Sequence, residues 1–260
     1  MPENLLSQRE LRRYGRQIML HEIGAEGQEK LKKASVLVIG AGGLGCPLLQ
    51  YLTSAGIGRI GIAEFDLVNE ENLQRQILYG SVDVGKLKSI IARDRLNELN
   101  SFVDIELFNL RIDSSNALRI FRNFDVIADA TDNLETRFVI NDACVALNKP
   151  MVHGAIYKFE SQVAVFNYRG GATYRCYNPG GKKESDRNPL PSETGIFGLL
   201  PGITGVYMAA EVIKIITGSG KVLGGKVLHI NIAENTFRTI TVRNIPENHD
   251  IKKIEGIKQT

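Results

Sequence analysis

The stretch Val36-Leu37-Val38-Ile39-Gly40-Ala41-Gly42-Gly43-Leu44-Gly45 decides the fold of this chain of 260 residues. An apolar run leads directly into a glycine-rich turn, and about 20 residues later a second apolar run, Ile60–Ala63, ends on Glu64. A buried strand, a glycine turn, a helix and a second strand that ends on an acid form a nucleotide-binding βαβ unit.

The glycines of this turn have separate physical tasks. Gly40 allows the tight turn, Gly42 lets the backbone approach a phosphate, and Gly45 lets the helix pack closely on the strand, with Gly43 in the same loop. The amino end of the following helix supplies partial positive charge for an anion. The pattern alone fits several nucleotides, so the residues that follow it must decide between them.

Composition and charge narrow the class of protein. The 32 basic and 29 acidic residues give a net charge of +3, too balanced to favour nucleic acid or a membrane surface as partner. The longest apolar runs are of strand length, which predicts no transmembrane helix. The first residues lack the apolar core of a signal peptide. We therefore expect a cytoplasmic enzyme.

Alternating strand-like and helical patterns predict an α/β fold, a Rossmann-like, doubly wound and mostly parallel sheet. The predicted strands are Ser35–Ile39, Arg59–Glu64, Asp104–Phe108, Val126–Ala130, Met151–Ala155, Gln162–Asn167 and Val227–Asn231. The predicted helices are Gly45–Ala55, Lys86–Leu99, Ser115–Arg122, Leu134–Asn148 and Gly205–Gly218, with a helical segment Ser7–Lys33 broken at Gly24 and Gly27.

The C-terminal third departs from this alternation. Gln162–Asn167 and Thr173–Tyr177 show period-2 character, which predicts added antiparallel strands with a hairpin turn at Gly170-Gly171. We expect one domain over residues 1–260, with an ATP-binding core at 35–150. A carrier-binding extension at 151–243 includes a crossover loop at 177–193, and a loosely held tail follows at 244–260.

The polar residues after the glycine loop favour ATP over a redox cofactor. Glu64 can accept both ribose hydroxyls and Asp66 follows it, while Asn72 and Arg75 lie one helical turn apart. Lys86 and Lys88 open the next helix, a position suited to a triphosphate. Asp132 follows an apolar strand at the sheet edge where ligands bind, which suits a magnesium ligand.

Each of these residues has a simpler interpretation. Arg75 and Lys88 taken alone are typical of solvated surface charges, Asp66 could orient a loop, and Asp132 could cap the helix that begins near Leu134. Their order behind a glycine loop favours a shared site.

Six segments resemble those of one family: Arg13-Tyr14-Gly15-Arg16-Gln17-Ile18, GAGGLG at 40–45, Asn72-Leu73-Gln74-Arg75-Gln76, Val84-Gly85-Lys86-Leu87-Lys88, Ala130-Thr131-Asp132-Asn133 and Leu200-Pro201-Gly202-Ile203. The family is MoeB/ThiF (HesA), the E1-like sulfur-carrier-protein adenylyltransferases, which are bacterial relatives of ubiquitin-activating enzyme. The resemblance covers residues 11–243.

The resemblance implies the activity. Such enzymes bind ATP and Mg²⁺, and adenylate the C-terminal glycine of a ubiquitin-like carrier protein of the ThiS or MoaD type, which ends in Gly-Gly. Pyrophosphate is released, a sulfur donor protein then acts on the adenylate, and the pathway is thiamine or molybdenum cofactor biosynthesis. The resemblance also implies a homodimer.

The same resemblance assigns residue roles. It places Gly43 against the nucleotide, Glu64 on the ribose, and Asp132 on magnesium. The phosphate-binding positions are Asn72, Arg75 and Lys88, with Gln76 in the same motif. Arg16 matches an arginine that reaches across the dimer to the γ-phosphate. Glu64 stands where the family commonly has Asp.

Two departures from the family pattern concern cysteine. Many members bind zinc through two CxxC pairs, but this chain has Cys176 alone of the first pair, with Thr173 in the other position, and no cysteine in 243–248. One thiol cannot build a four-ligand site, so we predict no zinc. Pro191 or Ser192 stands where the family places a crossover-loop cysteine, so we expect no covalent link to the carrier there.

Two alternatives remain open at this point. An NAD-dependent oxidoreductase would explain the acid after the second strand, but would leave Arg75, Lys88 and Asp132 without purpose. A repurposed E1-like relative would bind nucleotide without turnover, or act on another peptide or carboxamide substrate.

Overall fold

The computed structural model of the chain describes residues 5–179, 195–251 and 254. These residues form an eight-stranded sheet with the order β3-β2-β1-β4-β5-β6-β7-β8. The strands are β1 (Ser35–Ile39), β2 (Arg59–Ala63), β3 (Asp104–Phe108), β4 (Val126–Asp129), β5 (Met151–Tyr157), β6 (Glu160–Phe166), β7 (Lys226–Asn231) and β8 (Thr236–Thr241). β1 to β5 pair in parallel and β6 to β8 are antiparallel. The predicted fold class is confirmed.

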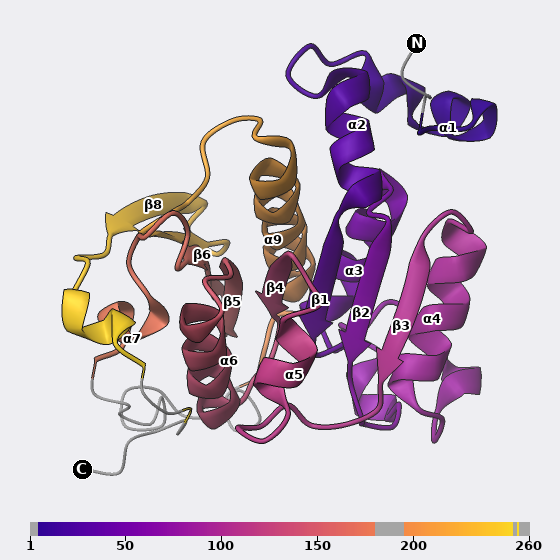
Figure 1. Ribbon diagram of the computed structural model, residues 1–260. Coiled ribbons are helices and arrows are strands. Elements are labelled where there is room, and N and C mark those ends of the chain that lie inside the picture. Colours follow the sequence, from indigo (N-terminus) through magenta and orange to yellow (C-terminus); the bar gives the residue numbers. More distant parts are fainter. Residues whose placement is uncertain (1–4, 180–194, 252–253, 255–260) are drawn as a thin grey trace.

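Helices cover both faces of the sheet (Figure 1). They are α1 (Gln8–Ile18), α2 (Gly24–Lys33), α3 (Gly45–Ala55), α4 (Lys88–Leu99), α5 (Ala117–Phe121), α6 (Leu134–Ala146), α7 (Tyr174–Tyr177) and α9 (Leu200–Thr217), with short 3-10 turns at Glu70–Asn72, Ser81–Asp83 and Pro246–His249. Side chains from α3, α4 and α9 form one apolar core, and those from α5, α6 and α7 form the other. β1, β2 and β4 are buried on both faces, which explains their apolar sequences, whereas the edge strand β3 is only partly buried and contains Asp104 and Glu106.

The antiparallel part of the sheet differs from the sequence prediction. Thr173–Tyr177, predicted as a strand, is instead the short helix α7. Helical spacing brings Tyr174 and Tyr177 onto the same ring, Phe166, at centroid distances of 5.6 and 6.0 Å. β8 pairs with β7 on the side away from β6. The sequence did not reveal it because four of its six residues are polar and most are exposed.

The N-terminal helices also differ in detail. The break in Ser7–Lys33 lies at 19–23, whereas Gly24 begins α2 and Gly27 lies inside it. A Cβ on Gly27 would lie 3.0 Å from Ile23 Cγ2, so glycine there permits close packing rather than ending the helix.

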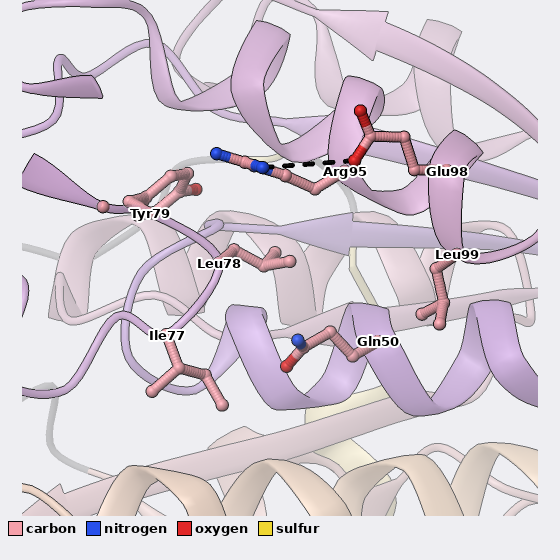
Figure 2. Close-up of a pocket in the computed structure, with 8 residues that line it drawn as sticks. Gln50, Ile77, Leu78, Tyr79, Arg95, Glu98 and Leu99 are labelled. Atoms are coloured by element: carbon pink, nitrogen blue, oxygen red, sulfur yellow. Dashed lines mark ion pairs between the residues drawn. The ribbon is translucent and has the colours of Figure 1, made fainter. Parts of the chain in front are cut away.

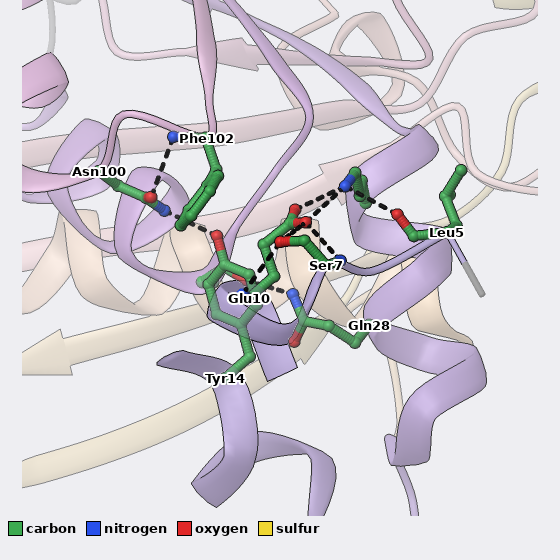
Figure 3. A network of polar contacts seen from close by, with 9 residues as sticks. Leu5, Ser7, Glu10, Tyr14, Gln28, Asn100 and Phe102 are labelled. Carbon is green, nitrogen blue, oxygen red and sulfur yellow. Dashed lines mark hydrogen bonds and ion pairs between the residues drawn. The ribbon is translucent and has the colours of Figure 1, made fainter. Parts of the chain in front are cut away.

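A polar network fixes α1 to the rest of the chain (Figure 3). Ser7 and Glu10 form a capping box, and Lys32 of α2 donates to the Glu10 carboxylate at 2.7 Å. The hydroxyl of Tyr14 accepts from Asn100 Nδ2 at 2.8 Å, just after the end of α4. α1 is therefore held against both α2 and the carboxyl end of α4.

The helix α9 is a core element. It begins at Leu200, before the predicted start at Gly205, and is long and apolar enough to cross a membrane by length and composition alone. Half of that stretch is buried, against α3 and the sheet. The buried Glu211 receives a 2.8 Å hydrogen bond from Leu223 N, and packing of this kind marks a core helix.

The close approach of α9 to α3 predicts opposite effects of two alanines in one helix. A Cβ on Gly205 would lie 2.5 Å from the Leu44 carbonyl oxygen, whereas one on Gly202 meets nothing within 4 Å. We expect Gly205→Ala to lower the free energy of unfolding by about 1–3 kcal/mol. Gly202→Ala should raise it by about 0.5–1 kcal/mol. Urea denaturation measures both, and equal effects would contradict this packing.

Candidate active site

The glycine loop joins β1 to α3 and lies against the end of β4. Gly40 has φ +94°, and a Cβ on it would lie 2.8 Å from the Ala130 carbonyl oxygen. A Cβ on Gly45 would lie 2.1 Å from the Gly40 carbonyl oxygen, so neither position tolerates a side chain. On Gly42 a Cβ would meet only Gln76 Nε2, at 3.5 Å. The turn is therefore tight behind Gly40 and Gly45 and open at Gly42.

Both backbone polar groups of Ala41, its N–H and its carbonyl, form hydrogen bonds with buried side chains. Its N–H donates to Glu64 Oε2 at 2.9 Å, and its carbonyl accepts from the Tyr79 hydroxyl at 2.7 Å. The other oxygen of Glu64 accepts the N–H groups of Phe65 and Asp66 at 2.8 and 2.9 Å. Glu64 thus binds the loop to β2, and a carboxylate with about four acceptor positions keeps capacity for a further donor.

Burial raises the pKa of two groups behind the loop. The pKa of the Cys46 thiol rises to about 12, mainly because the sulfur lies in the core, and the pKa of the Tyr79 hydroxyl is also raised well above its ordinary value. Cys46 therefore stays a thiol and Tyr79 stays a hydrogen-bond donor. Cys46 is a packing residue rather than a nucleophile.

Two buried amide side chains lie in the segment 72–76, of which Gln76 lies beside Gly42. The side chains of Asn72 and Gln76 are buried, and Asn72 Oδ1 and Gln76 Oε1 have no hydrogen-bond partner among the described residues. An unsatisfied buried polar atom costs about 1–3 kcal/mol, so such atoms in a native fold call for an explanation. Bound ligand or water at this site supplies one.

The cations of the predicted site lie around the same turn. Arg75 Cγ would lie 3.6 Å from a Cβ on Gly43, and Arg75 Nη1 donates to Glu71 O at 3.0 Å. Lys88 begins α4 and is buried, with its Nζ 3.3 Å from Asp66 Oδ2. An ammonium in this position, at a helix start, favours an anionic ligand.

Asp132 lies two residues beyond Ala130, which contacts Gly40. The N-cap of α6 is Asn133, whose Oδ1 accepts from Thr136 N at 2.9 Å. Asp132 is exposed, and no hydrogen bond or ion pair engages it within the described ranges. The capping alternative for Asp132 is therefore wrong, because its neighbour holds that position.

Arg16 lies apart from all of these residues. Tyr14 contacts Gly56, the residue that ends α3, whereas the glycine loop lies at the start of α3. The eleven residues of α3 span about 16 Å. Figure 1 shows α1 beyond the end of the sheet from which β2 and β3 begin, while their arrowheads point the other way. Arg16 cannot reach the glycine loop of its own chain.

A surface hollow lies between α3 and α4, next to Tyr79. Its volume is about 560 Å³, and its lining consists of Gln50, Ile77, Leu78, Tyr79, Gly80, Arg95, Glu98 and Leu99. Figure 2 shows the Arg95–Glu98 ion pair on one side of this α3–α4 hollow and Ile77 and Gln50 on the other. Through Tyr79, the hollow backs onto the carbonyl of Ala41.

Cys176 lies in a hydrogen-bonded pocket rather than among metal ligands. Its sulfur lies 3.3 Å from Thr173 Oγ1 and accepts from Ile245 N at 3.4 Å and Asn248 Nδ2 at 3.6 Å. Burial raises the pKa of this thiol, but these hydrogen bonds outweigh burial and the pKa lies below its ordinary value. No group of three metal-ligating side chains occurs within the described part of the chain.

Hydrogen bonds to Cys176 fix the beginning of the predicted loose tail. Their donors, Ile245 N and Asn248 Nδ2, belong to the first residues of that tail. Most of the predicted crossover loop at 177–193, with Pro191 and Ser192, lies outside the described residues, as does the end of the tail.

Comparison with known proteins identifies the family. Residues 14–250 match the ThiF family. The chain belongs to the ThiF family. It is 49% identical over 244 residues to the sulfur carrier protein adenylyltransferase of Thermus thermophilus, which covers 91% of this chain and 89% of that protein. It is 42% identical over 264 residues to the probable adenylyltransferase/sulfurtransferase MoeZ of Mycobacterium tuberculosis, covering 99% and 67%.

Other relatives are longer, and solved structures agree on the fold. The chain is 45% identical to the adenylyltransferase and sulfurtransferase MOCS3 of Aedes aegypti but spans 55% of its length. The crystal structure of PaaA superposes with a TM-score of 0.82 at 23% identity, covering 94% of this chain and 86% of that one. The structure of E. coli MccB with ATP gives 0.79 at 25% identity, covering 90% and 72%. The expected E1-like adenylyltransferase class is confirmed.

The capping assignment gives a test of Asp132 that needs no activity assay. Asn133→Ala should lower the free energy of unfolding by about 1 kcal/mol, because α6 loses its N-cap. Asp132→Ala should change it by less than about 0.5 kcal/mol, because an exposed side chain without partners is lost. Urea denaturation compares the two. A cost at Asp132 equal to that at Asn133 would assign it a structural role.

Proposed function

We propose that this ThiF-family chain adenylates the C-terminal glycine of a ubiquitin-like sulfur-carrier protein that ends in Gly-Gly. A carboxylate oxygen of the carrier bonds to the α-phosphorus of ATP, and the bond from that phosphorus to the pyrophosphate oxygen breaks. The products are an acyl-adenylate and pyrophosphate. A sulfur donor protein would then act on the adenylate, for thiamine or molybdenum cofactor biosynthesis in the cytoplasm.

One observation carries the proposal: the glycine loop, Arg75, Lys88 and Asp132 meet at one edge of the sheet. They do so in a chain that is 49% identical to a named sulfur carrier protein adenylyltransferase. The amide oxygens of Asn72 and Gln76, which have no hydrogen-bond partner in the described part of the chain, support a ligand at the same edge. In an NAD-dependent oxidoreductase, Arg75, Lys88 and Asp132 would have no role.

The chain's own residues support adenylation by position and charge. In this proposal the α3 amino end and the backbone at Gly42 and Gly43 bind phosphate oxygens, since the start of a helix carries partial positive charge. Arg75 and Lys88 neutralise charge on the leaving pyrophosphate. Glu64 accepts a ribose hydroxyl while it holds the loop through Ala41.

The residues present fit Mg²⁺. This ion binds proteins through one or two carboxylates and keeps several waters and phosphate oxygens as its other ligands. Asp132 offers one exposed carboxylate without a partner among the described residues, and that suffices for such a site. When bound, the metal would supply positive charge beside the phosphates.

We also propose that a homodimer completes the site. Arg16 lies beyond the far end of α3, so it can serve a nucleotide only on a second copy. A partner's α1 placed near Arg75 and Lys88 would cover the segment between them. That segment exposes Ile77 and Val82, at 61% and 76%, with Ile77 on the rim of the α3–α4 hollow.

Pyrophosphate exchange tests the function. The expected result is exchange of labelled pyrophosphate into ATP only when Mg²⁺ and one Gly-Gly-terminated carrier are present. The carrier that supports exchange also names the pathway. ATP binding without exchange, with every carrier, would favour a relative that acts on another acyl group. Tight NAD binding without ATP binding would contradict the proposal.

Mixed dimers test the role of Arg16 across the interface. Arg16→Ala and Asp132→Ala should each reduce exchange by at least about 100-fold, as expected for loss of a charge that contacts the reacting phosphates. A heterodimer with one variant in each chain regains one intact site, so it should recover a substantial fraction of activity. The heterodimer is isolated with two affinity tags.

Ile77→Lys tests the proposed dimer interface separately from the nucleotide site. It places a charge on the proposed dimer surface without touching the nucleotide residues, so it should yield monomers that still bind ATP. Light scattering measures the mass. A verified heterodimer without recovered activity, or an Ile77→Lys chain that remains dimeric, would contradict this arrangement.

A further inference from the structure

A buried carboxylate lies directly behind the Asp132 turn. Asp129 ends β4 and its side chain is fully buried. Its Oδ1 accepts the Thr131 N–H at 3.1 Å and the Thr131 hydroxyl at 2.6 Å. Its Oδ2 lies 2.8 Å from His153 Nδ1 on β5 and 3.7 Å from Arg137 Nε on α6. Three elements therefore meet at one carboxylate.

Arg137 holds the same turn from its other side. Its Nη2 donates to the Thr131 carbonyl at 2.8 Å, while Asp129 holds the Thr131 N–H. The two peptide groups that flank the Thr131 α-carbon are thus both fixed by buried charged side chains. The next residue along the chain is Asp132, so this network sets the point from which its side chain departs.

The charge state of the network follows from its contacts. Burial opposes ionisation of Asp129, but the hydrogen bond and charge of His153, followed by the charge of Arg137 and the hydrogen bond of Thr131, outweigh it and hold the Asp129 pKa below its ordinary value. An ionised carboxylate only accepts hydrogen bonds, so His153 Nδ1 carries the proton. The rings of Phe166 and Tyr174, at 5.8 and 5.1 Å, enclose the imidazole.

Stability alone gives little reason for such a network. Desolvation of a buried ion pair cancels most of its attraction, and apolar residues of similar size often serve the fold equally well. What buried, hydrogen-bonded charges add is a defined geometry. Here that geometry ends at the turn carrying Asp132, whose own carboxylate has no partner among the described residues.

We propose that Asp129, His153 and Arg137 are positioning residues, which fix the Thr131 backbone and thereby direct the Asp132 carboxylate toward the nucleotide-bound Mg²⁺. The proposal rests on the function proposed above for Asp132. It extends that function to a histidine from β5 and an arginine from α6 that touch neither nucleotide nor metal.

The test measures how much Mg²⁺ tightens ATP binding, by calorimetry with the full chain in Mg²⁺ and in EDTA. Arg137→Met and His153→Leu should lower this gain by about tenfold or more, as removal of groups that orient a metal ligand commonly does. Binding of metal-free ATP should stay within about threefold, because the glycine loop and its cations are untouched. His153→Gln keeps an N–H donor and should recover part of the gain.

Two further variants make the outcome decisive. Ile140→Val is the matched control: it removes one methyl group from the buried face of α6, away from the turn, and should leave the magnesium gain unchanged. Thr131→Val removes only the hydroxyl donor and should lower the gain. It tests the proposal even where Arg137→Met does not fold by circular dichroism.

The outcomes separate this inference from the proposed function. If Asp132→Asn leaves the magnesium gain intact, the metal assignment itself fails. If Asp132→Asn removes the gain while His153→Leu and Thr131→Val keep it, only the positioning role fails. Equal losses of metal-free and metal-bound affinity in His153→Leu and Ile140→Val would show a general loss of packing and would also overturn the inference.

Discussion

The contact between Gly40 and the Ala130 carbonyl governs the arrangement of the site. With a Cβ excluded at Gly40, the turn after β1 lies directly on the end of β4. This brings the glycine loop within two residues of Asp132, although the two segments are about 90 residues apart in the chain. A side chain at Gly40 would separate the glycine turn, proposed to bind phosphate, from the carboxylate proposed to hold the metal.

Two turns at this edge are held in the same way. At Ala41 a buried carboxylate takes the N–H and a tyrosine hydroxyl donates to the carbonyl, and at Thr131 a buried carboxylate takes the N–H and an arginine donates to the carbonyl. Both turns leave regular structure, where backbone groups lose their ladder partners. The same side chains satisfy those groups and rigidify the loops, so the proposed site stands on fixed backbone.

The sequence predicted the parallel core well, because its signals are local and strong. Uniformly apolar runs gave β1, β2 and β4 within one residue, and the glycine spacing gave the start and end of α3. It failed at β8, whose exposed residues carry no apolar alternation, and at α7, where ring packing on Phe166 overrides a strand-like pattern.

Within the site, the sequence could predict only residues whose position follows from their immediate neighbours in the chain. Asp132 and Lys88 could be named because each directly follows or begins a recognisable element. The partner of Asp129 is 24 residues away on another strand, so only the sheet register brings His153 beside it. A charged residue ending one apolar strand and a histidine within the next were the available signals. The roles of Arg16, Arg75 and Asp132 in chemistry stay predictions.

All three cysteines are buried, Cys46 and Cys144 completely. Burial raises the thiol pKa at both of these positions, so they have little thiolate character. Cys176 is covered by Thr173 and the 245–248 segment. Cys176, whose pKa lies below its ordinary value, is therefore the thiol of the three most open to alkylating reagents and oxidants. In a reconstituted sulfur-transfer system, inhibition by iodoacetamide would report on Cys176 or on the carrier's sulfur source, and not on Cys46 or Cys144.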